Sequence, residues 1–293
     1  MKKYGEYIKR FKEKSFFPFR KEEKGKTDNK KRWMLMGLKY GAFALAAVAL
    51  VRGIAVNSGG SITVSNSVGG RELPIYCVEC KEPKIALTFD AAWGNEDTAK
   101  ILEVLKKHQV HVPFFMTGGW VEKYPEDVRA ILAAGHDLGN HSENHKNMSQ
   151  LSGDNCQDEL MKVHNKVKEL TGYEMYLFRP PYGDYDNEVI CKASECGYYT
   201  IQWSIDSLDW KNYGADDIVK RVCGHKALKP GAIILCHNGA DYTAQALDTL
   251  LKQIKEKGYR FVPVSELIYR DNFYMKADGT QVSTLQNDSA SLQ

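Results

Sequence analysis

The sequence predicts an α/β fold in which about seven parallel strands form a barrel, preceded by a single transmembrane helix. Three observations support this expectation. Strand-like and helix-like segments alternate strictly between residues 84 and 267. The composition, 43% hydrophobic and 11% aromatic over 293 residues, is that of a globular chain able to build a sizeable core. Near the amino terminus, a basic run precedes one long apolar segment.

Residues 1–32 form a basic cytoplasmic tail in this interpretation, with thirteen Lys or Arg against five Asp or Glu, a net charge of +8. Residues 33–51 follow as a transmembrane signal anchor, nineteen mostly apolar residues interrupted by Lys39. About twenty such residues span a bilayer core as a helix, and Lys39 can snorkel toward the basic flank. The flank predicts that residues 1–32 stay inside and that the domain lies outside the cytoplasmic membrane.

A cleaved signal peptide is the main alternative for residues 33–51, and a buried core helix is another. The charged leader is too long for an ordinary signal peptide, and no clear small-residue cleavage site follows, so an anchor is favoured. The basic tail shows no nucleic-acid-binding motif, and its charge fits a flank that contacts anionic lipid. A membrane partner is therefore expected, a nucleic acid is not, and no protein partner can be inferred.

The remaining chain divides into a linker, a domain and a tail. Residues 52–73 are rich in Gly and Ser and predict a flexible linker, so the domain is expected to span residues 74–270. Residues 271–293 are polar and predict a loose tail. Seven cysteines are an odd number for an exported protein, so at least one thiol should be free. The Cys77-Val-Glu-Cys80 spacing favours a local disulfide or free thiols over a metal site, because no second pair accompanies it.

Within the domain, seven strands are expected, in residues 84–90, 111–119, 136–142, 175–181, 198–206, 231–239 and 259–267. Helices are expected between them, in residues 96–109, 125–135, 158–172, 187–197, 215–227 and 244–258. Such alternation argues for a parallel sheet with helical crossovers. A barrel related to the eight-stranded kind is favoured, and an open doubly wound sheet is the alternative.

Polar side chains gather at or just beyond the carboxyl ends of these strands: Asp90, His141, His145, Arg179, Asp206 and His237. Parallel α/β folds build their functional sites at this edge. One such residue would suggest only a helix cap or a surface side chain. Six at one edge favour a functional site.

The types of these residues indicate hydrolytic chemistry. In a helical turn, His141 and His145 would share one face and could bind one metal ion, although two solvated histidines are the alternative. Arg179, fixed by the two prolines after it, would keep a neighbouring carboxylate ionised. Asp206 is the expected partner of His237, whose pKa a carboxylate raises toward the working range of a general acid.

The order Asp90, His141-x-x-x-His145, Arg179-x-Pro-Tyr182, Asp206-x-x-x-Trp210 and Leu235-x-His237 resembles that of the NodB-homology polysaccharide deacetylases. Among them it looks most like the sporulation-associated PdaB-type proteins of spore-forming bacteria. The resemblance covers residues 83–268. It implies a distorted (β/α) barrel that removes N-acetyl groups from a cell-wall glycan, peptidoglycan or a related N-acetylglucosamine polymer.

The resemblance also assigns catalytic roles. It makes Asp90 the general base that deprotonates water and Arg179 the residue that orients it. Asp206 would tune the catalytic histidine, and His237 would be the general acid for the amine leaving group. Amide hydrolysis needs such an activated water, a stabilised oxyanion and a proton for nitrogen.

The remaining roles concern the metal and the substrate. The resemblance makes His141 and His145 ligands of a divalent metal, with zinc expected and cobalt, manganese or nickel as alternatives. The backbone N–H of Tyr182 would stabilise the oxyanion. Trp210 and Leu235 would form the groove wall and the pocket for the acetyl methyl group.

One position departs from the family pattern, because Ala91 stands where a second aspartate usually supplies the third metal ligand. A zinc ion with two protein ligands is held less tightly, and Glu96 and Asp97 are expected to cap the next helix instead. Three outcomes stay open: a labile metal with an extra water, weak catalysis with Asp90 drawn onto the metal, or a protein that binds glycan without cutting it. A different amide or ester hydrolase on the same barrel is a further alternative.

Overall fold

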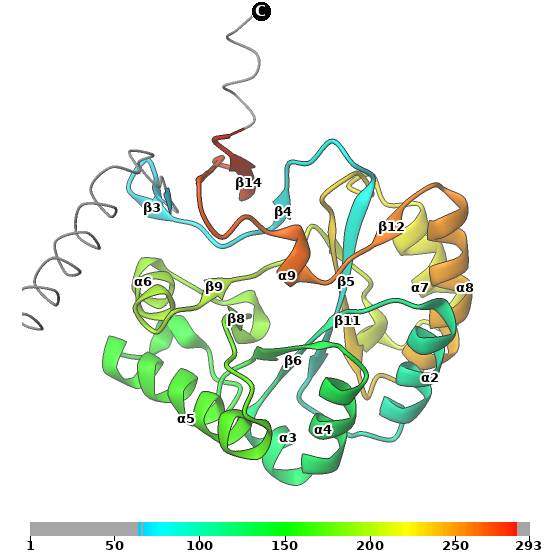
Figure 1. The fold of residues 1–293 in the computed structure, drawn as a ribbon, viewed down its shortest axis with the longest axis horizontal. Coiled ribbons are helices and arrows are strands. Elements are labelled where there is room, and N and C mark those ends of the chain that lie inside the picture. Colours follow the sequence, from blue (N-terminus) through cyan, green and yellow to red (C-terminus); the bar gives the residue numbers. More distant parts are fainter. Residues whose placement is uncertain (1–63, 66, 286–293) are drawn as a thin grey trace, which may run out of the picture. The chain divides into compact units, whose positions relative to one another are not determined.

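The computed structural model describes residues 64–65 and 67–285, and Figure 1 labels most of their helices and strands. The predicted basic tail and transmembrane anchor, residues 1–51, lie outside the described residues. Within the described part, no helix is both long and apolar enough to cross a membrane. The anchor therefore stays a prediction.

The central sheet contains eight parallel strands. Their hydrogen-bonded order is β10-β11-β5-β6-β7-β8-β9, and β12 pairs with the start of β5. The strands are β5 (Lys84–Ala91), β6 (Pro113–Met116), β7 (Asp137–Asn140), β8 (Leu177–Phe178), β9 (Tyr199–Thr200), β10 (Ile205–Asp206), β11 (Ile233–Asn238) and β12 (Arg260–Phe261). Residues 198–206, predicted as one strand, form both β9 and β10, which gives eight strands instead of seven. The prediction of a parallel α/β fold is confirmed.

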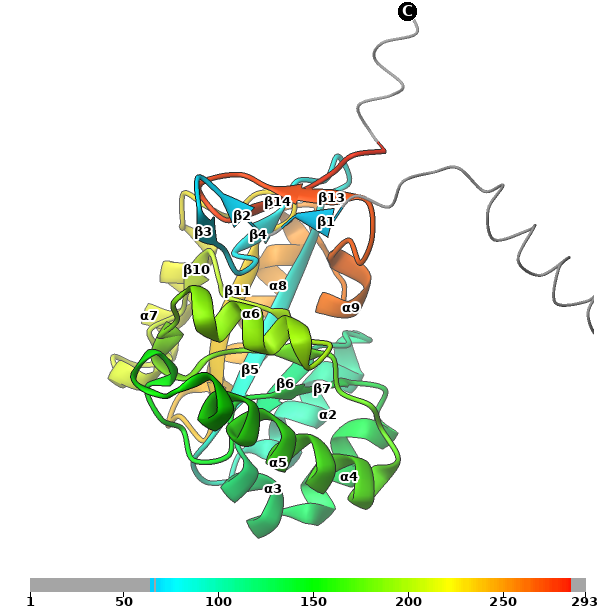
Figure 2. The same ribbon diagram turned by 90° about the vertical axis from the view of Figure 1, so that its left-hand side faces the viewer.

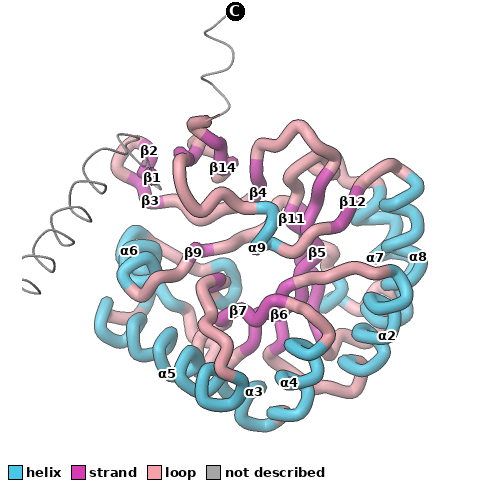
Figure 3. Tube along the Cα trace, viewed as in Figure 1, coloured by secondary structure: helices cyan, strands magenta, loops and turns pink. Residues whose placement is uncertain are grey.

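The barrel is distorted because β9 and β10, the two ends of the strand order, do not pair with each other. Ile75 occupies this position: its N–H donates to the Thr200 carbonyl and its carbonyl accepts from the Gln202 N–H, both at 2.8 Å. Helices surround the strands in Figure 3. The fold is thus an incompletely closed barrel, and the doubly wound alternative is not observed.

The helices follow the predicted pattern with two additions, at residues 118–123 and 264–267, the second within residues 259–267, which were predicted as a strand. They are α2 (Thr98–His108), α3 (Gly118–Lys123), α4 (Pro125–Ala133), α5 (Gly153–Thr171), α6 (Asn187–Glu195), α7 (Ala215–Cys223), α8 (Thr243–Glu256) and α9 (Val264–Leu267), with single 3₁₀ turns at Met148–Gln150, Pro181–Gly183 and Asp209–Lys211. The sequence analysis missed α3 because two glycines begin it. This helix forms because the Thr117 side chain accepts from the Trp120 N–H and the Trp120 ring is buried.

Alternation along β5 places its side chains in two cores and aims one of them at the barrel mouth. Leu87 and Phe89 belong to the outer core beneath the helices, whereas Ala86 belongs to the inner core. Asp90 lies in the inward series, two positions beyond Thr88, because successive side chains of a strand point to opposite faces. Ala91 belongs to the outer core and is fully buried. The end of β5 therefore presents one carboxylate to the barrel interior.

A second sheet covers the edge of the barrel opposite the carboxyl end of β5, as Figure 2 shows. Its order is β1-β13-β14-β4, formed by β1 (Val64–Ser65), β13 (Phe273–Met275), β14 (Thr280–Ser283) and β4 (Cys77–Val78). A small hairpin, β2 (Ser67–Val68) and β3 (Arg71–Glu72), precedes β4. The start of β4 lies against the start of β11, where Cys77 bridges Ala232.

This second sheet corrects the predicted linker and tail. Residues 67–72 of the expected linker form the hairpin, and residues 273–283 of the expected tail form two strands. The expected tail was predicted to be loose because it is polar, but polar groups in it are buried and form hydrogen bonds. Gln281, with no exposed surface, accepts from the Tyr269 N–H at 2.8 Å and donates to the Tyr269 carbonyl at 2.7 Å. All seven cysteines are free thiols, including Cys77 and Cys80.

Candidate active site

A cavity of about 320 Å³ lies at the carboxyl ends of β5, β10 and β11. Eight of its lining residues are predicted site residues: Asp90, His141, His145, Tyr182, Asp206, Trp210, Leu235 and His237. Ala92, Trp93 and Trp203 complete the lining. The ninth predicted residue, Arg179, is fully buried and contacts Asp90. The structure therefore brings all nine together.

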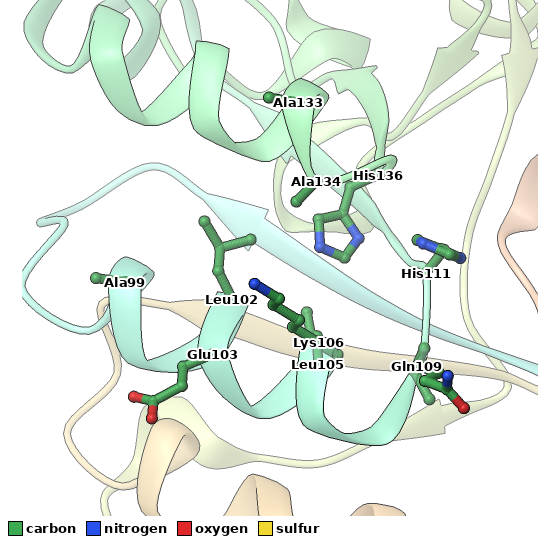
Figure 4. A pocket seen from close by; sticks show the side chains of 11 residues that line it. Ala99, Leu102, Glu103, Leu105, Lys106, Gln109, His111, Ala133, Ala134 and His136 are labelled. Carbon is green, nitrogen blue, oxygen red and sulfur yellow. The ribbon is translucent and has the colours of Figure 1, made fainter.

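A larger cavity, about 890 Å³, lies between α2 and α4 and is shown in Figure 4. Its walls are mainly apolar, and two imidazoles, those of His111 and His136, lie there with their ring centroids 5.8 Å apart. It contains none of the predicted site residues. A binding site is recognised by convergent polar and ionisable groups as well as by size, so the smaller cavity is the candidate active site.

Asp90 is an oriented carboxylate. The Arg179 guanidinium donates to Asp90 Oδ1 at 2.7 Å and to the Thr88 hydroxyl at 2.9 Å, and it stacks on the Phe115 ring. Burial alone would raise the pKa of Asp90, but the charge of Arg179, with smaller effects of His141 and His237, lowers it below its usual value. Asp90 is therefore ionised at neutral pH and fixed in position, as a general base requires.

Asp209, rather than Asp206, is the partner of His237, which corrects the prediction. Asp209 has no exposed surface, and its Oδ1 lies 2.7 Å from His237 Nδ1. Its Oδ2 accepts from the His237 backbone N–H at 2.7 Å and from the Thr243 hydroxyl at 2.6 Å. Burial would lower the pKa of His237, but the hydrogen bond and charge of Asp209, together with Asp90 and Asp206, raise it. The protonated form of His237 is thereby favoured.

Asp206 lies beside this pair and bonds elsewhere. Its Oδ1 accepts from the Leu208 N–H at 2.8 Å, a local turn at the end of β10. Burial raises the pKa of Asp206. The sequence offers two acids, three residues apart, as possible partners of His237. The 3₁₀ turn that begins at Asp209 places Asp209, and not Asp206, against the histidine. Asp209 stands directly before Trp210 in the sequence, and this position was the signal that could have identified Asp209 as the partner of His237.

His141 and His145 lie together, but the segment that carries them is not the predicted helical turn. It is a loop after β7 in which Ser142 and His145 have positive φ values of 63° and 52°. The two rings are 4.9 Å apart in an edge-on arrangement. Glu143, between them in the sequence, pairs with Lys166 at 2.5 Å.

The loop is held by side chains because it lacks helical hydrogen bonds. Asn140 Oδ1 accepts from the Ser142 N–H at 2.9 Å, and the Ser142 hydroxyl accepts from the His145 N–H at 3.0 Å. Glu159 of α5, itself buried, accepts from both the backbone N–H and the side-chain amide of Asn144 at 2.8 Å. These contacts fix the two imidazoles relative to each other.

The donors around His141 suit a divalent cation. His141 Nδ1 donates to the Arg179 carbonyl at 2.7 Å, so in the neutral ring Nε2 carries a lone pair. Burial lowers the pKa of His141 to about 4, which keeps it neutral at pH 7. Its Nε2 faces Asp90 Oδ2 at 3.5 Å, so the lone pair of the ring lies beside a negative charge that also attracts a cation. The residues fit a metal to this extent.

The site nevertheless lacks the third protein ligand that a catalytic zinc ion usually has. Among residues 64–65 and 67–285, no group of three or more His, Cys, Asp or Glu is arranged to hold a metal ion. Ala91 supplies no ligand and belongs to the outer core, whereas the neighbouring Ala92 lines the cavity. His141 and His145 are thus the two residues that would hold the ion.

The predicted substrate-binding residues form the walls. Tyr182 has a positive φ of 60° and is 67% exposed. Its ring contacts that of His145, with the two ring centroids 4.5 Å apart. Trp210 is 45% exposed, while Leu235 is buried at the base of the cavity. Trp93, which the sequence analysis did not assign, lies over the His237 ring with centroids 5.1 Å apart. Exposed aromatic rings around a polar cavity are typical of carbohydrate sites.

Asp97 joins the loop after β5 to the end of β11, instead of capping α2 as predicted. Its side chain makes no cap hydrogen bond, and Oδ1 accepts from the Gly239 N–H at 2.8 Å. Gly239, at φ 90°, lies so close to Gly94 that a side chain would crowd its backbone. The loop that carries Trp93 is therefore fixed against the strand that carries His237.

Known proteins resemble this chain in sequence. The profile of the family described as polysaccharide deacetylase matches residues 78–201. A Bacillus cereus peptidoglycan-N-acetylglucosamine deacetylase is 38% identical over 193 residues, which cover 64% of this chain and 89% of that protein. The Bacillus subtilis peptidoglycan-N-acetylmuramic acid deacetylase PdaA is 36% identical over 202 residues, covering 66% of this chain and 74% of that protein. The chain belongs to the polysaccharide deacetylase family.

Solved structures agree and add a contrast. A mutant of a protein described as a CE4 family pseudoenzyme, with restored enzymatic activity, has a TM-score of 0.65 and 37% identity, covering 70% of this chain and 72% of that one. The wild-type pseudoenzyme is from Bacillus anthracis, with the same TM-score of 0.65. The polysaccharide deacetylase family thus includes named peptidoglycan deacetylases and a pseudoenzyme among the relatives of this chain. The relatives named above do not confirm the closer resemblance to PdaB-type proteins, which stays a prediction.

Proposed function

We propose that this protein is a metal-dependent hydrolase that removes N-acetyl groups from peptidoglycan. The observation that carries the proposal is the pairing of β5 with β11, in which Asp90 and His237 are register partners. Each has its own buried partner, Arg179 for Asp90 and Asp209 for His237. An ionised carboxylate and an imidazole whose pKa is raised in favour of the protonated form therefore flank one cavity, which is the pair of groups that amide hydrolysis requires.

The residues divide the reaction between them. Asp90 accepts a proton from the attacking water, and Arg179 keeps the carboxylate aimed at it. The backbone N–H of Tyr182, at the cavity mouth, donates to the developing oxyanion. His237 donates its proton to the nitrogen as the carbon–nitrogen bond breaks. Leu235 accommodates the acetyl methyl group.

A divalent cation held by His141 and His145 would lower the pKa of water and polarise the acetyl carbonyl. Zinc is the proposed ion, with cobalt, manganese or nickel as alternatives, because imidazole nitrogen suits all of them. With two imidazoles and no aspartate at position 91, we expect weaker retention of the metal than in a three-ligand site.

A non-catalytic glycan-binding protein is the second candidate function. Ala91 favours it, as does the likeness to a protein described as a pseudoenzyme. Against it stand the two buried pairs, Asp90 with Arg179 and His237 with Asp209, because glycan binding alone has no need of an oriented base and a protonated acid.

Acetate release decides between the two. The purified full chain is incubated with peptidoglycan and with N-acetylglucosamine oligomers, first as prepared, then with a chelator, and then with zinc or cobalt returned. The proposal expects acetate that disappears with the chelator and returns with the metal. Asp90→Ala serves as the control and should lower the rate on the order of 10²-fold or more. Binding without acetate under every condition would favour the second candidate.

We further propose that the domain acts outside the cytoplasmic membrane, held by residues 33–51, and that it serves in sporulation. The basic flank at residues 1–32 supports the orientation, and the resemblance to sporulation-associated proteins supports the context. Protease added to intact cells or protoplasts should remove the domain and leave a small basic fragment. Complete protection of the domain would overturn the topology.

A further inference from the structure

The side-chain amide of Asn140, the last residue of β7, is held in one orientation by its neighbours. Its Oδ1 accepts from the Ser142 N–H at 2.9 Å, and its Nδ2 donates to the Leu160 carbonyl of α5 at 2.8 Å. The opposite orientation would place a donor against a donor and an acceptor against an acceptor. Nδ2 is therefore also the donor in the 3.0 Å contact with the Tyr198 hydroxyl.

The hydrogen bonds continue from Tyr198 to the surface of the domain. Tyr198 is buried, and burial raises its pKa, so the hydroxyl keeps its hydrogen. Because this hydroxyl accepts from Asn140, its hydrogen is donated to Nδ1 of His164 in α5, 2.7 Å away. In the neutral ring His164 Nε2 then carries the proton, which it donates to Glu174 Oε2 at 2.9 Å. A directed chain of hydrogen bonds thus joins the exposed Glu174 to Asn140.

Ser142 connects Asn140 to the loop that carries His141 and His145. Its N–H donates to Asn140 Oδ1, and its hydroxyl accepts from the His145 N–H at 3.0 Å. Ser142 and His145 both have positive φ, a conformation that residues other than glycine rarely adopt. Such a backbone persists only where surrounding contacts impose it. Asn140 supplies one of these contacts, and Tyr198 in turn holds Asn140.

We propose that Tyr198 and His164 are positioning residues that act through Asn140 on the loop carrying His141 and His145. Neither Tyr198 nor His164 is among the residues that line the candidate active site. That the loop holds a metal ion rests on the proposed function, whereas the positioning of the loop does not. Without the Tyr198 hydroxyl, one N–H of the buried Asn140 amide loses its partner, so the loop opens more easily.

Amide hydrogen exchange of the full chain, followed residue by residue, tests this positioning without metal or substrate. In Tyr198→Phe, the Ser142 N–H should exchange roughly five- to tenfold faster than in the wild type, the effect of one lost buried hydrogen bond. The Asn144 N–H is the internal reference in the same loop, because Glu159 of α5 accepts from it at 2.8 Å. Its exchange should stay close to that of the wild type.

Tyr259→Phe is the matched control, because the Tyr259 hydroxyl donates to the Leu228 carbonyl at 2.9 Å, directly before β12. It should leave exchange in the loop unchanged. The inference is overturned if Tyr198→Phe leaves Ser142 exchange as in the wild type or accelerates Ser142 and Asn144 equally. The same acceleration of Ser142 in Tyr259→Phe would also overturn it.

Two substitutions of His164 test the chain one step farther out, and they decide the question if Tyr198→Phe does not fold. His164→Leu removes the acceptor of the Tyr198 hydroxyl and should accelerate Ser142 exchange. His164→Asn keeps an acceptor at the position of Nδ1 and should restore exchange close to that of the wild type. Equal exchange in these two variants would contradict the directed chain of hydrogen bonds.

Zinc affinity and acetate release are measured separately. If the wild type binds zinc, Tyr198→Phe should lower the affinity about tenfold, as for other residues that orient metal ligands, and an unaltered affinity would overturn the positioning. Faster Ser142 exchange in Tyr198→Phe, with neither zinc binding nor acetate release in the wild type, rejects the proposed function and leaves the positioning. Zinc binding and acetate release with unaltered exchange reject only the positioning.

Discussion

Asp209 holds His237 through both carboxylate oxygens, Oδ1 at 2.7 Å from the ring Nδ1 and Oδ2 at 2.7 Å from the backbone nitrogen. One buried acid thus fixes the position of the histidine and favours its protonated form. Nδ1 is the donor in this bond, so Nε2 is the nitrogen left to face the substrate.

Asp209→Asn is expected to weaken that support and lower the pKa of His237. Because His237 must be protonated to act as an acid, activity falls as pH rises through its pKa. This alkaline limb should lie above pH 6.5 in the wild type, since the pKa of His237 is raised from that value, and should move to lower pH in the variant. The pH–rate profile and the NMR titration of His237 measure the shift. Asp206→Asn, the matched control, should shift the limb less, and an equal or larger shift would restore Asp206 as the partner.

Ala91→Asp tests the missing ligand through stability as well as activity. Ala91 is fully buried, so a carboxylate there that finds no cation should lower the free energy of unfolding by roughly 3 kcal/mol. Zinc should then raise the melting temperature of the variant, and its affinity for zinc should exceed that of the wild type. His141→Ala or His145→Ala should nearly abolish zinc binding.

Ala92→Asp is the matched variant, because Ala92 lines the cavity and a carboxylate there stays solvated without a metal. If zinc stabilises only Ala92→Asp, the third ligand belongs at position 92. Acetate release by Ala91→Asp but not by the wild type would identify the native protein as a binding module. Activity that resists chelators and survives loss of both histidines would contradict the metal mechanism.

His136 should make the fold sensitive to acid. It is buried, and its Nδ1 accepts from the Val112 N–H at 3.2 Å. Burial lowers the pKa of His136 to about 4, whereas an unfolded histidine titrates near about 6.5. The stability that neutral His136 contributes is fully present above the pKa of an unfolded histidine. It is lost as pH falls toward 4, because the histidine of the unfolded state binds a proton at higher pH than the buried one does. The loss should reach about 3 kcal/mol.

Urea unfolding at a series of pH values between 7.5 and 4.5 checks this loss. His136→Gln keeps an acceptor for Val112 but cannot titrate, so it should flatten part of the dependence; His141, with a pKa also near 4, contributes the rest. His111→Gln removes a smaller contribution to the lowered pKa of His136, the charge of the exposed neighbouring imidazole, so it should change the slope less than His136→Gln does. An unaltered slope in His136→Gln would contradict the assignment.

The chain should need its last strands to fold well. Ending it after residue 270 removes β13 and β14, including Phe273, Met275 and Val282, which are buried in the second sheet. The melting temperature should fall by roughly 10 °C or more from the lost apolar burial alone. A chain ending after residue 285 keeps both strands and should melt like the full chain. Equal melting of the two truncated chains would contradict the structural role of the sheet.

The sequence predicted the barrel well because its long strands and helices have strong periodicity. β5 and β11 are apolar runs that end in Asp90 and His237, so both the strands and the site residues could be read directly. Position along a strand also explains why nine residues from distant parts of the chain converge. Local geometry was harder to predict.

The failures occurred where short irregular turns decide which side chain points where. Asp206 and Asp209 are equivalent acids until a single 3₁₀ turn places one against His237. The four-residue spacing correctly predicted that the side chains of His141 and His145 lie together. A loop in which Ser142 and His145 have positive φ brings them together, however, and not a helical turn. The second sheet was missed because Gln281 is polar, and a polar residue that satisfies its hydrogen bonds internally looks like surface in a sequence.

The second sheet also determines from which side the domain can be held. Its strand β4 lies against the start of β11, through the Val78 N–H bond to Gly231 at 3.0 Å, and the cavity lies at the other end of that strand. Strands at both ends of the described domain, β1 and β14, belong to this sheet. A tether attached at either end of the domain therefore leaves the cavity mouth unobstructed.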